Sequence, residues 1–258
     1  MPSSSPQHEQ PPAAAFRSAA AAQGLNRLWV VPRAAVEARY ASLPASIPRP
    51  SALHPGYRTA LVLVSAGPDF WRGFRASLAP GAAVPDPTAH ALDRYTEAVV
   101  EALADALRAA DPGLCTVYPF HHARQVLGFA RLLGDASWLG AAPFGVQVEP
   151  QAGPWWALRG ALLTGLDWPP DPPSAAGAES PCIRCPAPCV TACPAGAVSK
   201  AGLDWHACAP FRLGGPTCAE TCLARLACPV APHLRYDADA IAHHYRASLR
   251  ELAALHGR

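Results

Sequence analysis

The chain has 258 residues, of which half are hydrophobic and 16% are charged, with a formal net charge of +2. This length supports one sizeable hydrophobic core and a small additional module. The near-neutral charge argues against the electrostatic attraction behind nonspecific nucleic-acid binding, so we expect no nucleic-acid partner. No apolar stretch reaches the roughly 20 residues that a helix needs to cross a bilayer, so we expect no membrane association.

The N-terminal segment, residues 1–22, is rich in proline, alanine, serine and glutamine and has almost no large apolar side chains. Because such a segment can bury little surface, we expect a disordered tail. The segment also lacks the basic start and apolar stretch of a secretory signal, and it has no twin arginine. We therefore expect a cytoplasmic protein.

Residues 23–173 have the pattern of a globular α+β core. The branched apolar run at 59–65 predicts a buried strand, and the aromatic residues at 70–74 suit a short helix. Thr88 is expected to open a long amphipathic helix that ends before Pro112 and Gly113. Further predicted elements are strands at 116–118, 144–148 and 155–163, a turn at 151–154, a helix at about 124–133, a proline-rich linker at 168–173 and a C-terminal helix at 237–255.

Nine cysteines need an explanation, and eight of them lie between Cys182 and Cys228. In a reducing compartment such a group indicates metal ligation sooner than disulfides. Cys115 stands alone in an apolar strand context, where we interpret it as a buried structural thiol.

The first four cysteines of the group follow the spacing C-x2-C-x3-C-x3-C-P, close to the C-x2-C-x2-C-x3-C-P run of bacterial ferredoxins. The last four follow C-x9-C-x3-C-x5-C-P, which departs further from that run. Thiolates suit iron because sulfur is a soft ligand, and in two-cluster ferredoxins the fourth cysteine of one motif ligates the other cluster. On this pattern one [4Fe–4S] cluster is held by Cys182, Cys185, Cys189 and Cys228, and a second by Cys193, Cys208, Cys218 and Cys222.

Zinc and disulfides are the alternatives for the same eight residues. Two zinc sites with four thiolates each would usually pair C-x2-C knuckles, and the sequence holds one such knuckle. The proline after the last cysteine of each half is also typical of ferredoxins. The spacing therefore favours two iron–sulfur clusters and a role in electron transfer or reduction.

A two-cluster module behind an α+β domain resembles the cobalamin-dependent iron–sulfur reductases, which include the epoxyqueuosine reductases of tRNA modification and the reductive dehalogenases. The stretch Gly-Pro-Trp-Trp-Ala-Leu-Arg-Gly at 153–160 is also similar to the G-x-W-F-A-I-R-G stretch of the cobalamin-processing CblC-like proteins. The resemblance implies a flavin-reductase-like, nitroreductase-related core followed by a small ferredoxin-like module. It also implies a corrinoid site to which Arg159 contributes and which Trp155 and Trp156 line.

Two departures separate the chain from these families. Val148, Glu149 and Pro150 stand where the CblC relatives show I-H-P. The regions at 118–122 and 140–143 carry neither the V-D-[ST] stretch that supplies a catalytic acid in epoxyqueuosine reductases nor their later G-K-N. These differences count against epoxyqueuosine reduction, and a missing twin arginine counts against a respiratory dehalogenase.

Several histidines are candidates for functional residues. His121 and His122 follow a predicted strand, where either could donate a proton or contact a ligand. His206 lies between cluster cysteines, where a solvated loop position is expected. His243 and His244 on the last helix are expected at the surface.

The leading hypothesis is a corrinoid-binding reductase in which a ferredoxin- or flavodoxin-like donor passes electrons through both clusters to cobalt. The alternatives are a noncatalytic electron carrier or cobalamin-trafficking protein, and a tRNA-modifying enzyme similar to epoxyqueuosine reductase. The expected organisation is a tail at 1–22, a candidate corrinoid-binding core at 23–173, a ferredoxin-type module at 180–232 and a C-terminal helix at 237–258.

Overall fold

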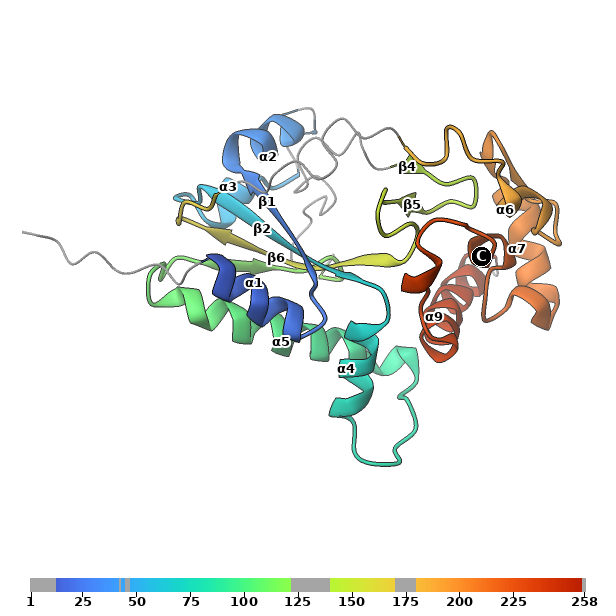
Figure 1. The fold of residues 1–258 in the computed structure, drawn as a ribbon, viewed down its shortest axis with the longest axis horizontal. Coiled ribbons are helices and arrows are strands. Elements are labelled where there is room, and N and C mark those ends of the chain that lie inside the picture. Colours follow the sequence, from blue (N-terminus) through green and yellow to red (C-terminus); the bar gives the residue numbers. More distant parts are fainter. Residues whose placement is uncertain (1–12, 42, 45–46, 122–139, 170–179, 257–258) are drawn as a thin grey trace, which may run out of the picture. The chain divides into compact units, whose positions relative to one another are not determined.

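The computed structural model describes residues 13–41, 43–44, 47–121, 140–169 and 180–256 (Figure 1). Helices and strands both occur throughout these ranges, which confirms a mixed helix-and-sheet fold. The helix expected at 124–133 and His122 lie outside the described residues. No helix in the described ranges combines the length and apolar character that a membrane span requires.

The chain divides into two compact units that interleave along the sequence. The first comprises Met1–Ser65, Asp93–Asp135 and Leu158–Pro172. The second comprises Ala66–Leu92, Ala136–Ala157 and Pro173–Arg258. The units therefore do not follow the expected order of core, module and C-terminal helix, because segments from the middle of the chain group with the cysteines.

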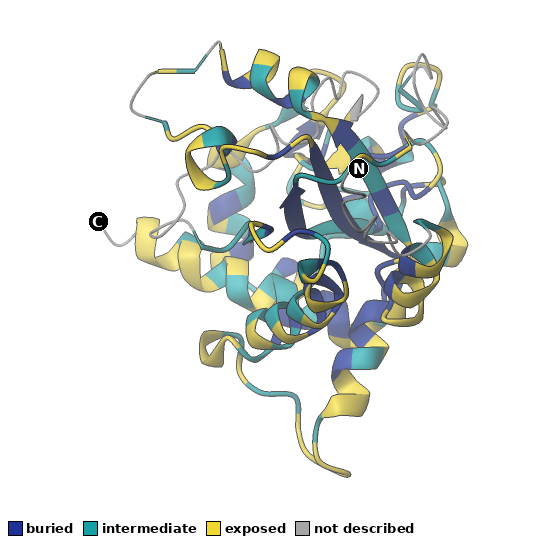
Figure 2. Cartoon of the chain, turned by 90° about the vertical axis from the view of Figure 1, so that its left-hand side faces the viewer, coloured by how far each residue is buried: buried dark blue, intermediate teal, exposed yellow. Residues whose placement is uncertain are grey.

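The first unit is built on a four-stranded sheet of order β1-β2-β6-β3. Its strands are β1 Arg27–Pro32, β2 Thr59–Ala66, β3 Cys115–Val117 and β6 Trp156–Thr164. β1 pairs antiparallel with β2, placing Arg27 opposite Val64, and β3 pairs antiparallel with β6, placing Cys115 opposite Leu163. All of β2 is buried, as its unbroken apolar run predicts, and Figure 2 shows dark blue buried residues along the middle of the sheet with teal, half-buried residues beside them.

Helices α1 Ala13–Ala22, α2 Arg33–Tyr40, α3 Pro50–Leu53 and α5 Ala91–Arg108 complete the first unit. Gly160 of β6 faces Val100 of α5, and a Cβ on that glycine would lie 3.2 Å from the valine methyl. The α5 helix therefore packs closely on the sheet, on the face along which α1 also runs (Figure 1).

The long helix begins three residues later than its expected start at Thr88. Pro87–Ala89 forms a separate 3-10 turn, η1, in which the Asp86 side chain accepts the Thr88 amide at 2.9 Å. His90 then takes a left-handed φ of 49°, which interrupts the helical hydrogen bonds. The helix α5 starts only after this residue.

The prediction that the whole of 1–22 is disordered is wrong for Ala13–Ala22, which forms α1. Alanine has the highest helix propensity, so a run of alanines folds readily once one side can be buried. Phe16 and Ala20 provide that side, and the Phe16 ring meets the Trp168 ring edge-on at 5.2 Å. The contact between Phe16 and Trp168 thus anchors a segment whose composition predicted a disordered tail.

The second unit contains the following elements: α4 Asp69–Ser77, β4 Gly140–Ala141, β5 Gln147–Val148, α6 Pro188–Thr191, β7 Val198–Ser199, β8 Gly202–Leu203, α7 Trp205–Gly214, η3 Pro216–Cys218, α8 Leu223–Leu226, η4 Pro232–Leu234 and α9 Ala238–His256. The strand expected at 144–148 is shorter than predicted, because Gly145 takes a φ of 84° in the turn of a β4–β5 hairpin. Helices α4 and α9 match their predicted positions.

Aromatic packing joins α4 to α9. Trp71 is buried, and its ring lies 5.3 Å from the Phe74 ring and 5.1 Å from the His243 ring. His243 is itself buried, so the expectation that it lies at the surface is wrong. Helix α9 places the His243 ring against the indole of Trp71, a contact that the sequence of α9 alone does not reveal.

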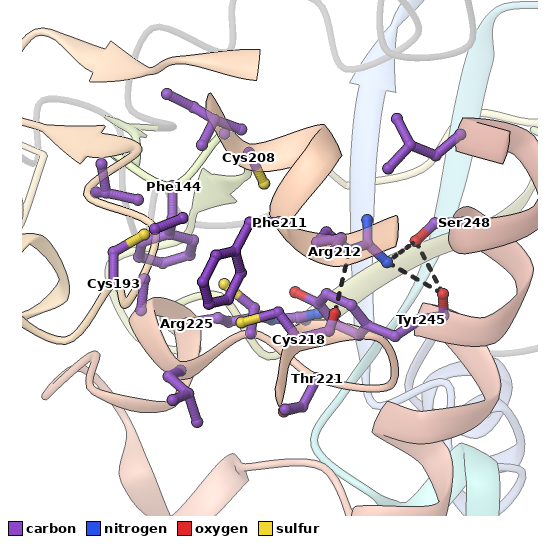
Figure 3. A pocket seen from close by; sticks show the side chains of 18 of the residues that line it. Phe144, Cys193, Cys208, Phe211, Arg212, Cys218, Thr221, Arg225, Tyr245 and Ser248 are labelled. Atoms are coloured by element: carbon purple, nitrogen blue, oxygen red, sulfur yellow. Dashed lines mark hydrogen bonds between the residues drawn. The ribbon is translucent and has the colours of Figure 1, made fainter. Parts of the chain in front are cut away.

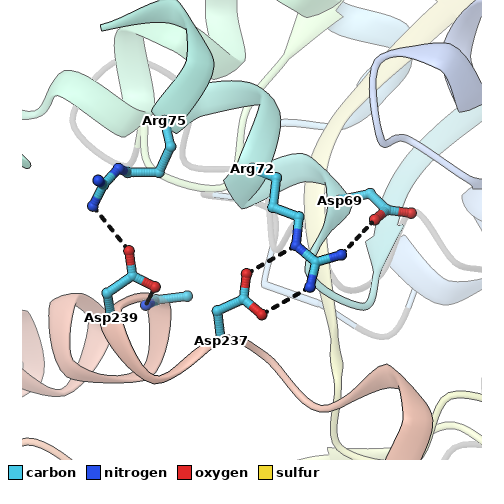
Figure 4. Close-up of polar contacts among 6 residues, drawn as sticks. Asp69, Arg72, Arg75, Asp237 and Asp239 are labelled. Atoms are coloured by element: carbon cyan, nitrogen blue, oxygen red, sulfur yellow. Dashed lines mark hydrogen bonds and ion pairs between the residues drawn. The ribbon is translucent and has the colours of Figure 1, made fainter. Parts of the chain in front are cut away.

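Ion pairs flank this contact (Figure 4). Arg72 donates from Nε and Nη2 to the two carboxylate oxygens of Asp237, at 2.9 and 3.0 Å. Arg75 donates to Asp239 at 3.0 Å. Both aspartates stand at the start of α9, where negative charge is also favoured by the helix dipole.

Replacing Trp71 with alanine is expected to lower the free energy of unfolding by about 3–5 kcal/mol, the range for large aromatic side chains removed from a packed site. The neighbouring Arg72→Ala variant is the matched control, because its side chain is exposed and exposed ion pairs contribute little. Urea denaturation followed by circular dichroism measures both. Equal losses in the two variants would contradict the ring contact as the main link between α4 and α9.

Candidate functional site

The nine cysteines are all free thiols in the structure, so none is paired as a disulfide. Burial is the largest cause that raises the pKa of Cys228, and the charges of Cys182, Cys185 and Cys189 raise it further. Burial likewise raises the pKa of Cys189, with Cys185 and Cys182 adding to the effect. These four thiols therefore lie close enough to interact electrostatically, and we call them the first thiol set.

The second thiol set forms in the same way around Cys208. Burial raises the pKa of this thiol, Arg212 lowers it, and Cys222, Cys193 and Cys218 raise it again. The structure thus brings the eight cysteines together in the two groups that the ferredoxin-like spacing predicts.

The chain path explains why the two motifs exchange their last cysteine. Cys189 lies on α6, which packs against α8, and Cys228 directly follows α8. Cys193 follows α6 by two residues, beyond the Pro188–Thr191 turn, and joins Cys222 at the start of α8. Each short helix therefore has one set at one end and the other set at its opposite end.

A cluster and a single metal ion require different separations of the thiols. Among the described residues, no three His, Cys, Asp or Glu side chains lie close enough together to hold one metal ion. Zn–S bonds of about 2.3 Å would bring four thiolates to about 3.8 Å from one another. In a [4Fe–4S] cluster each thiolate binds a different iron, so the thiols stand further apart. The two alternatives use the same eight donors, and the iron and zinc contents of the reconstituted protein decide between them.

The first thiol set lies in an apolar environment. Cys189 and Cys228 belong to a buried cluster with Phe144, Val148 and Val198, which the β4–β5 hairpin and β7 contribute. Backbone amides supply the polar contacts: Ala187 N–H donates to Cys185 Sγ at 3.4 Å, and further amides donate to Cys189 and Cys228. Amide hydrogen bonds to cluster sulfurs are one of the devices that set reduction potential.

The second thiol set lines a cavity of about 520 Å³ (Figure 3). Cys193, Cys208 and Cys218 point toward this space from three separate elements, together with Phe144 and Phe211. Its remaining lining comes mainly from α7, α8 and the C-terminal half of α9. The second set therefore borders an open space, whereas the first lies within a packed apolar cluster.

The turn before β6 is held by Glu149, the residue that replaces the histidine of the I-H-P pattern. Its buried carboxylate accepts the amides of Gln151, at 2.9 Å, and Ala152. The Gly153 amide donates to the Glu149 carbonyl at 2.7 Å and closes the turn. A carboxylate that accepts one buried and one partly buried amide stabilises the turn, so Glu149 has a structural role here.

Trp155 has no exposed surface. The guanidinium carbons of Arg225 and Arg235 lie 5.0 and 5.7 Å from its ring centroid, and the Tyr236 ring packs edge-on at 5.8 Å. Arg225 also donates to the Pro154 carbonyl at 2.6 Å. The ring predicted to line a cofactor pocket is therefore occupied by contacts to the cysteine module.

Trp156 and Arg159 are half-buried on β6. Arg159 Nε donates to Ser65 Oγ at 2.8 Å, which fixes its side chain at the carboxyl end of β2. Trp155 belongs to the second unit and Arg159 to the first, and their shared role at a corrinoid site stays a prediction.

His121 lies four residues after β3, in the first unit. Its Nε2 is 2.5 Å from Glu97 Oε1, and its ring packs against Tyr118 and Phe120 at 4.9 and 5.0 Å. A carboxylate that fixes an imidazole in this way is a common arrangement for proton transfer. Of the two adjacent histidines proposed from the sequence, this is the one that the structure describes.

Sequence reasoning missed Arg212 and Tyr245, which stand beside the second thiol set. Arg212 follows Cys208 by four residues on α7, so both side chains project from one face of the helix. This spacing was the available signal. Tyr245 could not be found in this way because it comes from α9, and its hydroxyl hydrogen-bonds to Cys222.

No family model matches the sequence, and neither does any curated protein. The fold is similar to a crystal structure of epoxyqueuosine reductase with an epoxyqueuosine-modified tRNA stem loop, at a TM-score of 0.50 and 16% identity over 89% of this chain and 68% of that chain. It is also similar to selenomethionine-labelled epoxyqueuosine reductase (TM-score 0.50, 16%, 88% and 70%) and to the Bacillus subtilis enzyme with its catalytic loop swung out of the active site (0.51, 16%, 87% and 66%).

These matches show an epoxyqueuosine-reductase-like fold, and they give no support to the CblC-like resemblance. They also overturn the expectation that nucleic acid is excluded as a partner, because one of the matched proteins is bound to a tRNA stem loop. The error came from using the net charge of the whole chain. A stem loop can be held by a local site, which a near-neutral total charge does not reveal.

A Gly153→Ala substitution is expected to destabilise the second unit, because the new Cβ would lie 2.5 Å from the carbonyl oxygen of Val230. Gly196→Ala is the matched control: both glycines have a φ near +60°, but nothing lies within 4 Å of Gly196. Both variants carry the roughly 1–2 kcal/mol cost of alanine in a left-handed conformation.

The close contact should lower the free energy of unfolding of Gly153→Ala by about 1–3 kcal/mol more, which is the range for overpacking. Thermal and urea unfolding of the two variants measure the difference. Identical stabilities would contradict a tight approach between the turn before β6 and the segment that follows Cys228.

Proposed function

We propose that this chain is an iron–sulfur oxidoreductase of the epoxyqueuosine-reductase type, which reduces a modified nucleoside in tRNA. One observation carries the proposal: eight thiols gather into two sets of four within a fold similar to those reductases. From the sequence alone, a tRNA-modifying enzyme of this type is an alternative to corrinoid reduction, and the fold comparison favours it.

The donor atoms of both sets fit [4Fe–4S] clusters. Each set offers four soft thiolates and at least one backbone amide directed at sulfur, and the first set also lies among apolar side chains, which are features that iron–sulfur ligation uses. Bound there, each cluster would supply one-electron transfer. The residues of this chain would hold the two clusters, exclude water from the first and place charged groups beside the second.

Two clusters suit a two-electron reduction. Removing an epoxide oxygen as water to leave an alkene takes two electrons and two protons, and each cluster accepts one electron at a time. A ferredoxin- or flavodoxin-like protein is the proposed source of these electrons. For proton delivery we propose His121, held by Glu97, since the V-D-[ST] stretch of the family is not visible in the region at 118–122.

The corrinoid site was the leading hypothesis, and its proposed residues fit only in part. Trp155 does not fit, because Arg225, Arg235 and Tyr236 surround its ring. Trp156 and Arg159 keep part of their surface exposed and remain proposed contacts. We therefore derive no step through a corrinoid, and added hydroxocobalamin is one arm of the assay below.

Each thiol set is expected to hold half of the iron. After anaerobic reconstitution, Cys189→Ala and Cys218→Ala should each lose about half of the protein-bound iron and of the visible absorption. Cys115→Ala is the matched control outside both sets and should keep all of it. Full iron retention in either set variant would contradict the assignment, and stoichiometric zinc without visible absorption would support the zinc alternative instead.

Reduction of a modified tRNA tests the function itself. The reconstituted chain is incubated anaerobically with a low-potential reductant and an anticodon stem loop carrying epoxyqueuosine, with or without hydroxocobalamin. We expect the nucleoside to lose one oxygen atom by mass spectrometry, and the Cys218→Ala variant to be inactive.

A His121→Gln variant should keep its iron but lose at least tenfold in turnover. A fully loaded wild-type protein that binds no stem loop and leaves its nucleoside unchanged in both arms would exclude this function. Activity that depends on hydroxocobalamin would restore the corrinoid to the mechanism.

A further inference from the structure

The two thiol sets differ in the charge that surrounds them. The main charges acting on Cys182, Cys189 and Cys228 of the first set are those of the neighbouring thiols. In the second set a guanidinium is added, since Arg212 lines the same cavity as Cys208 and Cys218 and its Nε donates to the Cys218 carbonyl at 3.2 Å. One site is therefore apolar, and the other contains a buried cation.

Arg212 is fixed in place by contacts from two other elements, η3 and α9 (Figure 3). Its Nε donates to the Cys218 carbonyl at 3.2 Å, and its Nη2 donates to the Tyr245 carbonyl at 3.2 Å and to Ser248 Oγ at 3.0 Å. Its guanidinium carbon lies 5.1 Å from the Tyr245 ring centroid. The side chain is 8% exposed, so its charge is held at the thiols and weakly screened by water.

None of these contacts is an ion pair with a carboxylate. Carbonyls, a hydroxyl and an aromatic face satisfy the donors of Arg212 and leave its positive charge uncompensated by them. Glu251 also lines the cavity, but it is exposed and water therefore screens it. Arg212 is therefore a buried positive charge beside the second set that these contacts do not neutralise.

Tyr245 adds a second polar contact to the same site. Its hydroxyl hydrogen-bonds to Cys222 and to Arg225. The Tyr245 ring also packs against the Arg212 guanidinium, whose carbon lies 5.1 Å from the ring centroid, so the two side chains are positioned together. Both sets thus have hydroxyl and amide contacts, from Ser180 at Cys182 and from Tyr245 and Leu223 at the second set, and the buried guanidinium of Arg212 is what distinguishes the second set.

From this asymmetry we infer that Arg212 and Tyr245 make the second thiol set the higher-potential cluster site, the one that is reduced first and holds the electron at rest. A cluster gains negative charge when it is reduced, so a fixed neighbouring cation and a hydrogen-bond donor stabilise the reduced form. The inference rests on the proposed iron–sulfur function and assigns an order to its two centres.

The test is a redox titration of the reconstituted chain followed by electron paramagnetic resonance. In the wild type, the signal of higher midpoint potential should be the one absent from Cys218→Ala. In Arg212→Gln, the midpoint potential of the same signal should fall by at least about 59 mV. For one electron this equals a tenfold change in the ratio of reduced to oxidised cluster. The other signal should stay within error.

Arg212→Lys is the matched control, because it keeps the charge while losing the guanidinium geometry. A shift less than half that of Arg212→Gln is expected. Equal shifts in both variants would overturn a charge effect. Tyr245→Phe removes one hydroxyl only and should lower the same potential by a smaller amount, which provides a test if Arg212→Gln fails to assemble the second cluster.

The outcomes separate this inference from the proposed function. A protein that binds no clusters at all overturns both. Two intact clusters whose order is reversed, or whose potentials do not respond to Arg212→Gln and Tyr245→Phe, overturn the inference and leave the iron–sulfur function standing.

Discussion

The second unit depends on the requirement that four thiols from distant parts of the chain converge at each of two points. Neither set can form from one short segment, because the last cysteine of each motif belongs with the other set. The chain must therefore fold back so that α8 packs on α6 and places Cys228 near Cys182. The C-terminal helix then lies over the second set, where its Tyr245 meets Cys222.

Contacts outside the cysteine motifs keep this arrangement in place. The turn that Glu149 closes brings Gly153 against Val230, two residues beyond Cys228. Arg225, which sits between Cys222 and Cys228 in sequence, packs on Trp155 and donates to Pro154. The stretch at 153–156 that looked like part of a cofactor pocket thus serves in part as a support for the thiols.

The sequence was informative where the determining interaction is local or periodic. The apolar run of β2, the aromatic residues of α4 and the spacing of the cysteines each predicted what the structure shows. Prediction from the sequence failed where a contact with a residue far away in the chain determines the structure. Phe16 makes α1 stable through Trp168, His243 is buried by Trp71, and Arg212 acquires its role from Tyr245 and Ser248. No pattern within a helix identifies the residue that will pack on it from elsewhere in the chain.

The interleaving of the two units limits how a protein of this kind can change in evolution. Recombination moves continuous stretches of a gene, and a C-terminal stretch carrying all eight cysteines would leave behind α4 and the β4–β5 hairpin. A host that received such a stretch would lack the indole that covers His243 and the valine and phenylalanine that surround the first thiols. The cysteine region transferred alone would therefore lose the packing that surrounds its first thiol set.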